Sequence, residues 1–227
     1  MATKPQPLRV FLSYSHNDRR FAGALKRKLE AFRFSVFVAH DDVNPSDDFV
    51  AGILEELRHS DIVMPLLTKS FHRSHWTDQE CGLALNLDKL ILPVSKGVNP
   101  YGFLRNRHAY IIKKGKSLDA VLADLLSSLT HQKKVANKFR DSLILAVRTS
   151  SGFPKSIAIF NLLVKLTPFS RRQMKLLLKY SIAQDQVYRS TEASKLLNQI
   201  VRRNPRTTDK ELVSQFMKRR GYGGYTA

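Results

Sequence analysis

Residues 74–80, SHWTDQE, combine a hydroxyl, an indole ring and a carboxylate at spacings that could serve chemistry. Ser74, Trp76 and Glu80 are spaced as if they shared one edge of a helix. If the predicted helix begins a little before Trp76, Trp76 and Glu80 lie on the same face, because residues four apart are neighbours on a helix surface. An aromatic ring beside a carboxylate offers a stacking surface and a hydrogen-bond acceptor. The pattern is therefore compatible with a ligand site in which Glu80 is the working carboxylate.

A structural interpretation of Glu80 stands beside this one. Thr77 and Glu80 have the spacing of a capping box, in which Thr77 would cap the helix and Glu80 would bond back to its backbone amide. An acidic residue in the first turn also suits the helix dipole. The two roles are compatible, because an acid in the first turn can point into a cleft.

The chain lacks the residue patterns of several other chemistries. It contains neither a glycine-rich loop ending in GK[ST] nor a GxGxxG after the first predicted strand. A zinc site needs clustered cysteine and histidine ligands, whereas this chain has one cysteine and seven scattered histidines. His72 and His75 have no third ligand nearby, and Cys81 is expected to be a buried helix thiol. Asp41 and Asp42 are expected to bond a loop turn rather than a metal.

The elements that must position these residues alternate between strand and helix in the first half of the chain. Short β-branched and aromatic runs alternate with segments of helical periodicity. The predicted strands are residues 9–15, 35–39, 61–67, 90–94 and 108–114, and the predicted helices are residues 18–32, 49–60, 77–89 and 117–129. This alternation predicts a parallel sheet covered on both faces. Ligands bind such sheets beyond the carboxyl ends of the strands, here at residues 13–18, 39–46 and the segment before Trp76.

The second half has helical periodicity throughout and predicts a small bundle of four or five helices. The predicted helices are residues 133–149, 153–166, 170–184, 190–203 and 208–220. Ser170 with Gln173 and Thr208 with Glu211 have capping-box spacing. The glycine-rich end, residues 221–227, is expected to be mobile. We place the domain boundary near residue 131, giving domains 1–131 and 132–227.

Charge divides the chain in the same place. Residues 1–131 hold 18 Lys and Arg against 14 Asp and Glu, and residues 132–227 hold 20 against 5. The net charges of the two parts are therefore +4 and +15 of a total of +19. A surface this basic could meet nucleic acid, an anionic membrane or an acidic protein, or it could be simply a solvated helical surface. Arg171, Arg172, Lys175 and Lys179 lie on one predicted helix and could follow a phosphate backbone.

Composition sets the expected environment. The longest stretch without a charged residue is nine residues, 156–164, far short of the about twenty apolar residues of a membrane span. The start, MATKPQPLRV, has no apolar signal segment, and a single cysteine allows no intrachain disulfide. We therefore expect a cytoplasmic protein without a membrane span.

Three segments in the first half resemble Toll/interleukin-1 receptor (TIR) domains. RVFLSYSHND is similar to the first box of the family, FSVFVAHDDVNPSDDF to its second strand and following loop, and SHWTDQE to the Ser-x-Trp-x-x-x-Glu segment of TIR domains that cleave NAD. The resemblance covers about residues 8–130. It implies a flavodoxin-like sheet of five parallel strands, the TIR fold, followed by an all-α helical domain.

The resemblance also implies an NAD glycohydrolase in which NAD is the substrate and no cofactor is needed. Nicotinamide leaves as a neutral molecule, so no general acid is required, and one carboxylate can hold the ribose and stabilise the charge at its anomeric carbon. That carboxylate would be Glu80, with Ser74 and Trp76 contacting the substrate. Phe11 and Ser13 could line the same crevice, or they could serve core packing and a turn hydrogen bond. The products would be nicotinamide and ADP-ribose or a cyclic form.

The family resemblance leaves other roles open. TIR enzymes commonly act in defence or cell-death signalling after TIR domains assemble, often through the long loop after the second strand. That loop usually carries a Pro-Gly pair, whereas here Pro45 is followed by Ser46, among Asp41, Asp42, Asp47 and Asp48. The alternatives are a non-catalytic TIR adaptor that acts by protein contact and a nucleic-acid-sensing helical domain with a TIR output.

Overall fold

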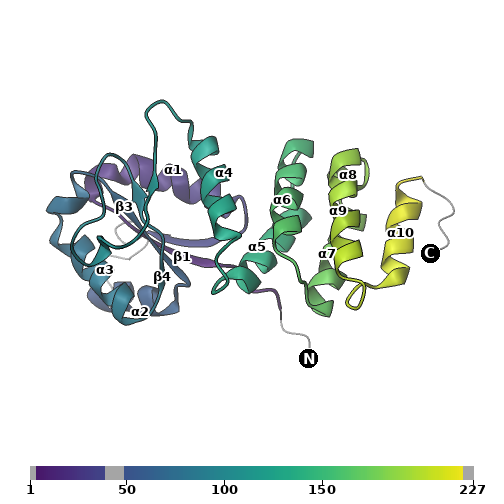
Figure 1. The fold of residues 1–227 in the computed structure, drawn as a ribbon, viewed down its shortest axis with the longest axis horizontal. Helices are drawn as coiled ribbons and strands as arrows, with labels where there is room; N and C mark the ends of the chain where they lie inside the picture. Colours follow the sequence, from purple (N-terminus) through teal and green to yellow (C-terminus); the bar gives the residue numbers. More distant parts are fainter. Residues whose placement is uncertain (1–3, 39–48, 222–227) are drawn as a thin grey trace. The chain divides into compact units, whose positions relative to one another are not determined.

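The computed structural model describes residues 4–38 and 49–221. The described chain forms two compact units, which we treat separately (Figure 1). The sheet unit is residues 8–129, and the helical unit is residues 130–221 together with residues 4–7. The segment before the first strand thus joins the helical unit, whereas sequence analysis had placed it in the first domain. The acidic loop at residues 41–48 and the tail at residues 222–227 lie outside the described residues.

The sheet unit is built on a fully parallel sheet, as predicted. Its strands are β1 (Arg9–Ser13), β2 (Ser35–Val38), β3 (Ile62–Leu67), β4 (Leu90–Ile91), β5 (Val94–Ser95) and β6 (Tyr110–Ile111). The order is β2-β1-β3-β5-β6, with β4 also paired to β3. Every residue of β3 is buried, because this central strand has a neighbour on each side and a covered surface on each face. The flavodoxin-like TIR fold class is confirmed.

The predicted fourth strand is divided into two short segments. β4 pairs with the start of β3 and β5 with its end, and Leu92 and Pro93 lie between them. Pro65 of β3 lies in the corresponding gap, between the two pairings. Proline has no N–H and cannot donate to a ladder. Two prolines at the same place therefore interrupt the regular pairing, so one predicted strand appears as two.

Helices cover both faces of the sheet. They are α1 (Arg19–Glu30), α2 (Phe49–His59), α3 (His75–Asn86) and α4 (Leu118–Leu129). In Figure 1, α1 and α4 lie on one side of the sheet and α2 and α3 on the other. The apolar face of β1 and β3 packs against α2 and α3 through Phe11, Val63, Leu57 and Ala84. This packing places α3, which carries the candidate carboxylate, directly against the central strands.

The helical unit contains six helices among the described residues, whereas four or five were predicted. They are α5 (Ala136–Arg148), α6 (Phe153–Lys165), α7 (Arg171–Ala183), α8 (Asp185–Tyr188), α9 (Thr191–Arg203) and α10 (Lys210–Arg219). The additional helix, α8, is a single short turn between two predicted helices. In the part of the chain that the structure describes, no helix is long and apolar enough to cross a membrane.

One of the two predicted capping boxes in this unit is confirmed, and the other is wrong. Ser170 caps α7 and Gln173 returns the bond, as the spacing predicted. At α10 the cap is Asp209, whose carboxylate accepts from the amides of residues 211 and 212. The Thr208 hydroxyl instead donates to the carbonyl of Asn204 at 2.7 Å. Both residues are good caps, and the chain path after Asn204 selects the second.

A buried carboxylate organises the helical unit. Asp141 of α5 is 4 % exposed. It accepts two hydrogen bonds from Arg172 of α7, at 2.6 and 2.8 Å, one from the Gln173 amide at 2.8 Å and one from the backbone N–H of Gln6 at 3.1 Å. The network thus joins α5, α7 and the segment before β1. Arg172 is a structural residue, in contrast to the sequence-based expectation that it would face a phosphate backbone.

We predict that Asp141→Ala destabilises the helical unit by about 3 to 5 kcal/mol, because it leaves the Arg172 guanidinium half-buried without its anion. Urea unfolding followed by circular dichroism at 222 nm measures the change. Glu192→Ala, at the start of α9, serves as the surface control. A loss below about 1 kcal/mol for Asp141→Ala would show that water replaces the carboxylate without cost.

Candidate functional site

Helix α3 begins before Trp76, and this start decides the position of Glu80. The helix spans His75–Asn86 with Ser74 as its N-cap, so Thr77 lies inside the first turn and Glu80 in the second. The Thr77 hydroxyl donates to the carbonyls of Phe71 and Ser74, at 2.9 and 2.8 Å, instead of capping an amide. The capping-box interpretation of Glu80 is therefore wrong, and its carboxylate is available for another partner.

That partner is Ser13, the last residue of β1. The Ser13 hydroxyl donates to Oε2 of Glu80 at 2.5 Å, and both side chains are buried. β1 lies between β2 and β3 in the sheet, so the strand order changes direction at this strand. The carboxyl end of a strand at such a switch point is where open α/β sheets bind ligands. Glu80 thus lies where the fold places its ligands.

The environment of Glu80 brings the pKa of its carboxyl close to neutral pH. The side chain is 3 % exposed, and burial raises its pKa to about 7, against which the Ser13 hydrogen bond acts by lowering it. Within residues 4–38 and 49–221, Oε1 of Glu80 has no hydrogen-bond partner. A buried polar atom without a partner costs free energy, so its presence points to a group that binds there. Strongly shifted carboxylates of this kind gather at functional sites.

The structure treats the other predicted site residues differently. Trp76 lies one turn before Glu80 on α3 and is 39 % exposed, so its indole reaches the surface. Ser74 caps the helix start from a partly exposed position. Phe11 is completely buried and packs its ring on Phe37, with the centroids 5.3 Å apart. Core packing, the alternative that the sequence left open, therefore describes Phe11 in this structure.

Polar residues that sequence analysis did not single out tie the loop after β1 to the loop after β3. The Thr68 hydroxyl donates to the Asp18 carboxylate at 2.7 Å and accepts from the Phe71 amide at 3.0 Å. The Asn17 amide reaches the Ser70 hydroxyl at 3.4 Å. These bonds join two loops at the carboxyl edge of the sheet, beside the segment that leads into α3. The polar residues after the first strand could be recognised in the sequence, but the loop after β3 to which they bond could not.

Cys81 adds no second reactive group beside Glu80. Burial, with the nearby Glu80 and Asp78 carboxylates, raises the pKa of the Cys81 thiol to about 12, so the thiol stays protonated. Among the described residues, no three His, Cys, Asp or Glu side chains are grouped as a metal site. Asp41 and Asp42 lie outside the described residues. The chemistry that the described site offers is that of one buried carboxylate.

A separate cavity of about 520 Å³ lies elsewhere in the sheet unit. Its lining includes Phe21 of α1, Lys96 after β5, and Lys113 and Lys114 after β6. The Lys96 ammonium lies 5.1 Å from the centroid of the Phe21 ring. Glu80 does not line this cavity, so the lysines form a basic hollow distinct from the carboxylate.

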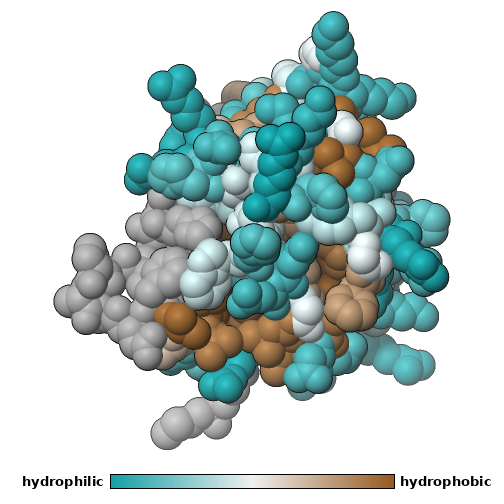
Figure 2. Space-filling view, turned by 90° about the vertical axis from the view of Figure 1, so that its left-hand side faces the viewer, coloured by the Kyte–Doolittle hydropathy of each residue, from teal (hydrophilic) through white to brown (hydrophobic). Residues whose placement is uncertain are grey.

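The surface of the sheet unit also carries exposed apolar side chains. Phe103 is 83 %, Ile111 60 % and Val50 45 % exposed. Figure 2 shows one face of the molecule that is mostly hydrophilic, with apolar surface in its lower part and in a smaller area at the upper right. Contiguous apolar patches, rather than single exposed side chains, mark surfaces that contact other proteins.

We predict that Glu80→Gln stabilises the protein at pH 8 and leaves its stability nearly unchanged at pH 4.5. Glu80 titrates near 4.5 when unfolded and near 7 when folded, so the folded chain binds more protons between these values. Wild-type stability therefore falls as pH rises from about 4.5 to 7 and stays reduced above 7. The neutral glutamine avoids this loss, which is at most about 3 kcal/mol.

Chemical denaturation at the two pH values measures this difference. Glu55→Gln, on the exposed side of α2, is the matched control and should show no such pH dependence. An equal stability difference between Glu80→Gln and wild type at both pH values would contradict the raised pKa.

Comparison with known proteins identifies the family to which the sheet unit is similar. Residues 10–126, just over half of the chain, match the family model described as TIR domain. Among solved structures, the TIR domain of a Toll-related receptor from the lower metazoan Hydra magnipapillata is similar, at 19% sequence identity and a TM-score of 0.47, over 53% of this chain and 96% of that chain. No curated protein matches the chain. Because the family model covers the sheet unit almost from β1 to the end of α4, the chain belongs to the TIR-domain family.

Proposed function

We propose that the sheet unit is an NAD glycohydrolase that cleaves the bond between nicotinamide and ribose, with Glu80 as its catalytic carboxylate. The observation that carries the proposal is the buried Glu80 at the carboxyl end of β1, held through one oxygen by Ser13 while the other has no partner among the described residues. The resemblance of residues 74–80 to NAD-cleaving TIR domains supports the same assignment. The products are nicotinamide and ADP-ribose or its cyclic form.

The two oxygens of Glu80 divide the work. Oε2 is oriented by the Ser13 hydroxyl, and Oε1 is available to accept a hydrogen bond from a ribose hydroxyl. As the bond to nicotinamide breaks, its electron pair leaves with the neutral ring and positive charge develops at the anomeric carbon. A preorganised carboxylate in a site of low dielectric stabilises that charge. Water then adds to the carbon, or the adenine ring does so in the cyclic product.

Trp76 supplies the flat surface that this reaction needs. Its indole reaches the surface one helical turn from Glu80, where a planar group of the substrate can stack. Ser74, at the helix N-cap, is placed to add a polar contact at the same end of α3. Burial of Glu80 keeps the carboxylate in a site of low dielectric, where its attraction for the charge that develops at the anomeric carbon is stronger than in water.

We expect Glu80→Gln to lower NAD cleavage at pH 8 by at least about a hundredfold, because the amide keeps the shape and loses the charge. Purified protein is incubated with NAD at high protein concentration, and the products are identified by mass spectrometry. Glu55→Gln should retain wild-type activity. Cleavage by Glu80→Gln at the wild-type rate would overturn the assignment of Glu80.

The pH profile tests the Ser13 contact separately. Wild-type activity should rise as pH passes through about 7, because the ionised carboxylate is the active form. Ser13→Ala removes the hydrogen bond that lowers the pKa of Glu80, so its profile should move to higher pH. Ser95→Ala removes another buried strand hydroxyl, one bonded to the Val98 carbonyl, and should reduce stability without moving the profile. Identical profiles for the Ser13→Ala variant and wild type would show that Ser13 does not act on Glu80.

A non-catalytic adaptor is the second candidate function. The specific observation in its favour is the exposed apolar surface of the sheet unit, above all Phe103 at 83 % exposure. Self-assembly of TIR domains, and a role in defence or cell-death signalling, are compatible with either function. The NAD assay separates them, because an adaptor gives no nicotinamide with or without Glu80.

A further inference from the structure

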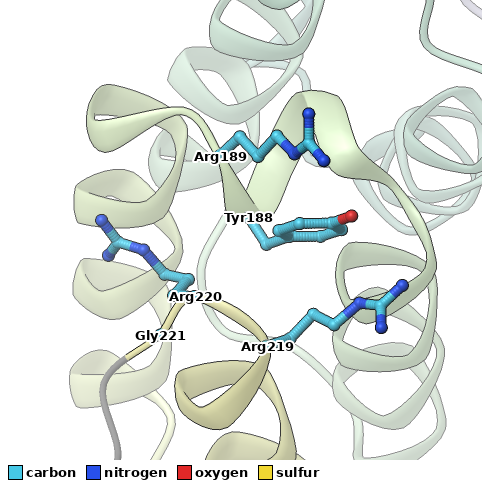
Figure 3. Close-up of a pocket in the computed structure, with 5 residues that line it drawn as sticks. All are labelled: Tyr188, Arg189, Arg219, Arg220 and Gly221. Carbon is cyan, nitrogen blue, oxygen red and sulfur yellow. The ribbon is translucent and has the colours of Figure 1, made fainter.

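Two arginines lie around one tyrosine in the helical unit, at a cavity of about 670 Å³ that Arg220 also lines (Figure 3). Tyr188 is the last residue of α8 and Arg189 follows it, while Arg219 ends α10 and Arg220 follows it. Figure 3 shows Arg189 and Arg219 on opposite sides of the Tyr188 ring. The Arg219 guanidinium lies 5.2 Å from the ring centroid. Two helix ends that are distant in sequence thus place their cations around one aromatic ring.

The ends of both helices explain part of this arrangement but not all of it. A cation in the last turn of a helix is stabilised by the helix dipole, by about 0.3 to 1 kcal/mol. Gly221, with a φ of 86°, closes α10 and donates from its amide to the carbonyl of Lys218 at 3.0 Å. These effects favour a basic residue at each helix end. They do not require the two ends to meet around Tyr188, so the convergence needs a further reason.

The positive charges of Arg189 and Arg219 are not neutralised by a carboxylate in the part of the chain that the structure describes. Within the described residues, Arg189 and Arg219 form no ion pair with a carboxylate, and both side chains are exposed. Residues 132–227 contain only five acids, of which Asp141 is held by Arg172 and Asp209 caps α10. Like charges gathered in one hollow repel one another, which favours binding of an anion there.

The groups in the cavity suit a ligand that carries both a phosphate and a planar ring. The guanidinium fork matches the oxygens of phosphate in pairs, and it also stacks on flat rings. Unpaired bases stack on aromatic side chains and on arginine planes in the same way. The surrounding unit, with 20 Lys and Arg against 5 acids, suits a polyanion better than a small ligand. We propose that this cavity binds single-stranded nucleic acid, with Arg189 and Arg219 each contacting a backbone phosphate.

A second basic surface in the same unit provides the comparison. Arg171, Lys175 and Lys179 are exposed along α7, as the sequence predicted, and form a stripe without a cavity. Scattered exposed charges attract nucleic acid only through screened, long-range forces. The cavity adds paired hydrogen bonds and stacking to that attraction. Removing two positive charges from the cavity and two from the α7 stripe therefore distinguishes a specific binding site from a general basic surface.

The test measures binding of a fluorescent single-stranded oligonucleotide of about 16 nucleotides to the full chain by fluorescence anisotropy. The double variant Arg189→Gln with Arg219→Gln is compared with Lys175→Gln with Lys179→Gln, which removes the same charge. The cavity variant should lose more than about tenfold in affinity, and its dependence of log K on log salt should become less steep by about 1.4. The α7 variant should lose less than about threefold. Circular dichroism confirms that both variants are folded.

A third variant and two competitors complete the test. Arg189→Lys with Arg219→Lys keeps the charge but loses the paired hydrogen bonds, so it should recover only part of the lost affinity. Adenosine monophosphate should compete poorly, because it lacks the neighbouring phosphates. Vesicles with anionic lipid should not displace the oligonucleotide from the cavity. The proposal would be overturned if the two glutamine variants lost affinity equally or if the lysine variant recovered it fully. It would also be overturned if the mononucleotide bound as well as the oligonucleotide, if the vesicles displaced the oligonucleotide, or if no binding occurred at low salt.

Discussion

The hydrogen bond between Ser13 and Glu80 is the constraint on which the candidate site depends. It joins the end of the central strand β1 to the second turn of α3, which are 67 residues apart in the chain. Burying a carboxylate is costly, and the pKa of Glu80, raised to about 7, reflects that cost. Ser13 satisfies one oxygen and so holds the group in place. A protein that needed only stability would be better served by a neutral residue here, which makes the charge itself the feature to explain.

The packing around this bond explains how α3 reaches it. Phe11 and Ser13 project from the same face of β1, and Phe11 anchors that face in the core formed with α2 and α3. The loops after β1 and β3 are joined by Asp18 and Thr68, so the path into α3 is held at both ends. The buried end of β1 and the packed helix α3 therefore hold one carboxylate at the edge of the sheet. Side chains that are held in this way need little reorganisation when a ligand binds.

The helical unit contains many basic side chains and few acidic ones. Two of its acids therefore have definite structural roles. Asp141 is buried where it gathers Arg172, Gln173 and the backbone of Gln6, and Asp209 is used as a helix cap. Arg189 and Arg219 form no such pair with a described carboxylate. The contrast separates basic residues that hold the fold together from those that remain available to an external anion.

The sequence by itself determined the features that rest on local periodicity and on order along the chain. These are the parallel sheet, the four helices that cover it, the helical second half, the Ser170 cap and the placement of Glu80 near the start of a helix. Only the tertiary structure decided which groups meet: Ser13 with Glu80, Asp141 with Arg172, and Arg189 with Arg219 around Tyr188. It also selected among equivalent local signals, choosing Asp209 over Thr208 and starting α3 before Thr77. The reason is physical: a helix or strand repeats over a few residues and leaves a pattern there, whereas a contact between residues tens of positions apart is set by packing and leaves no pattern in either segment.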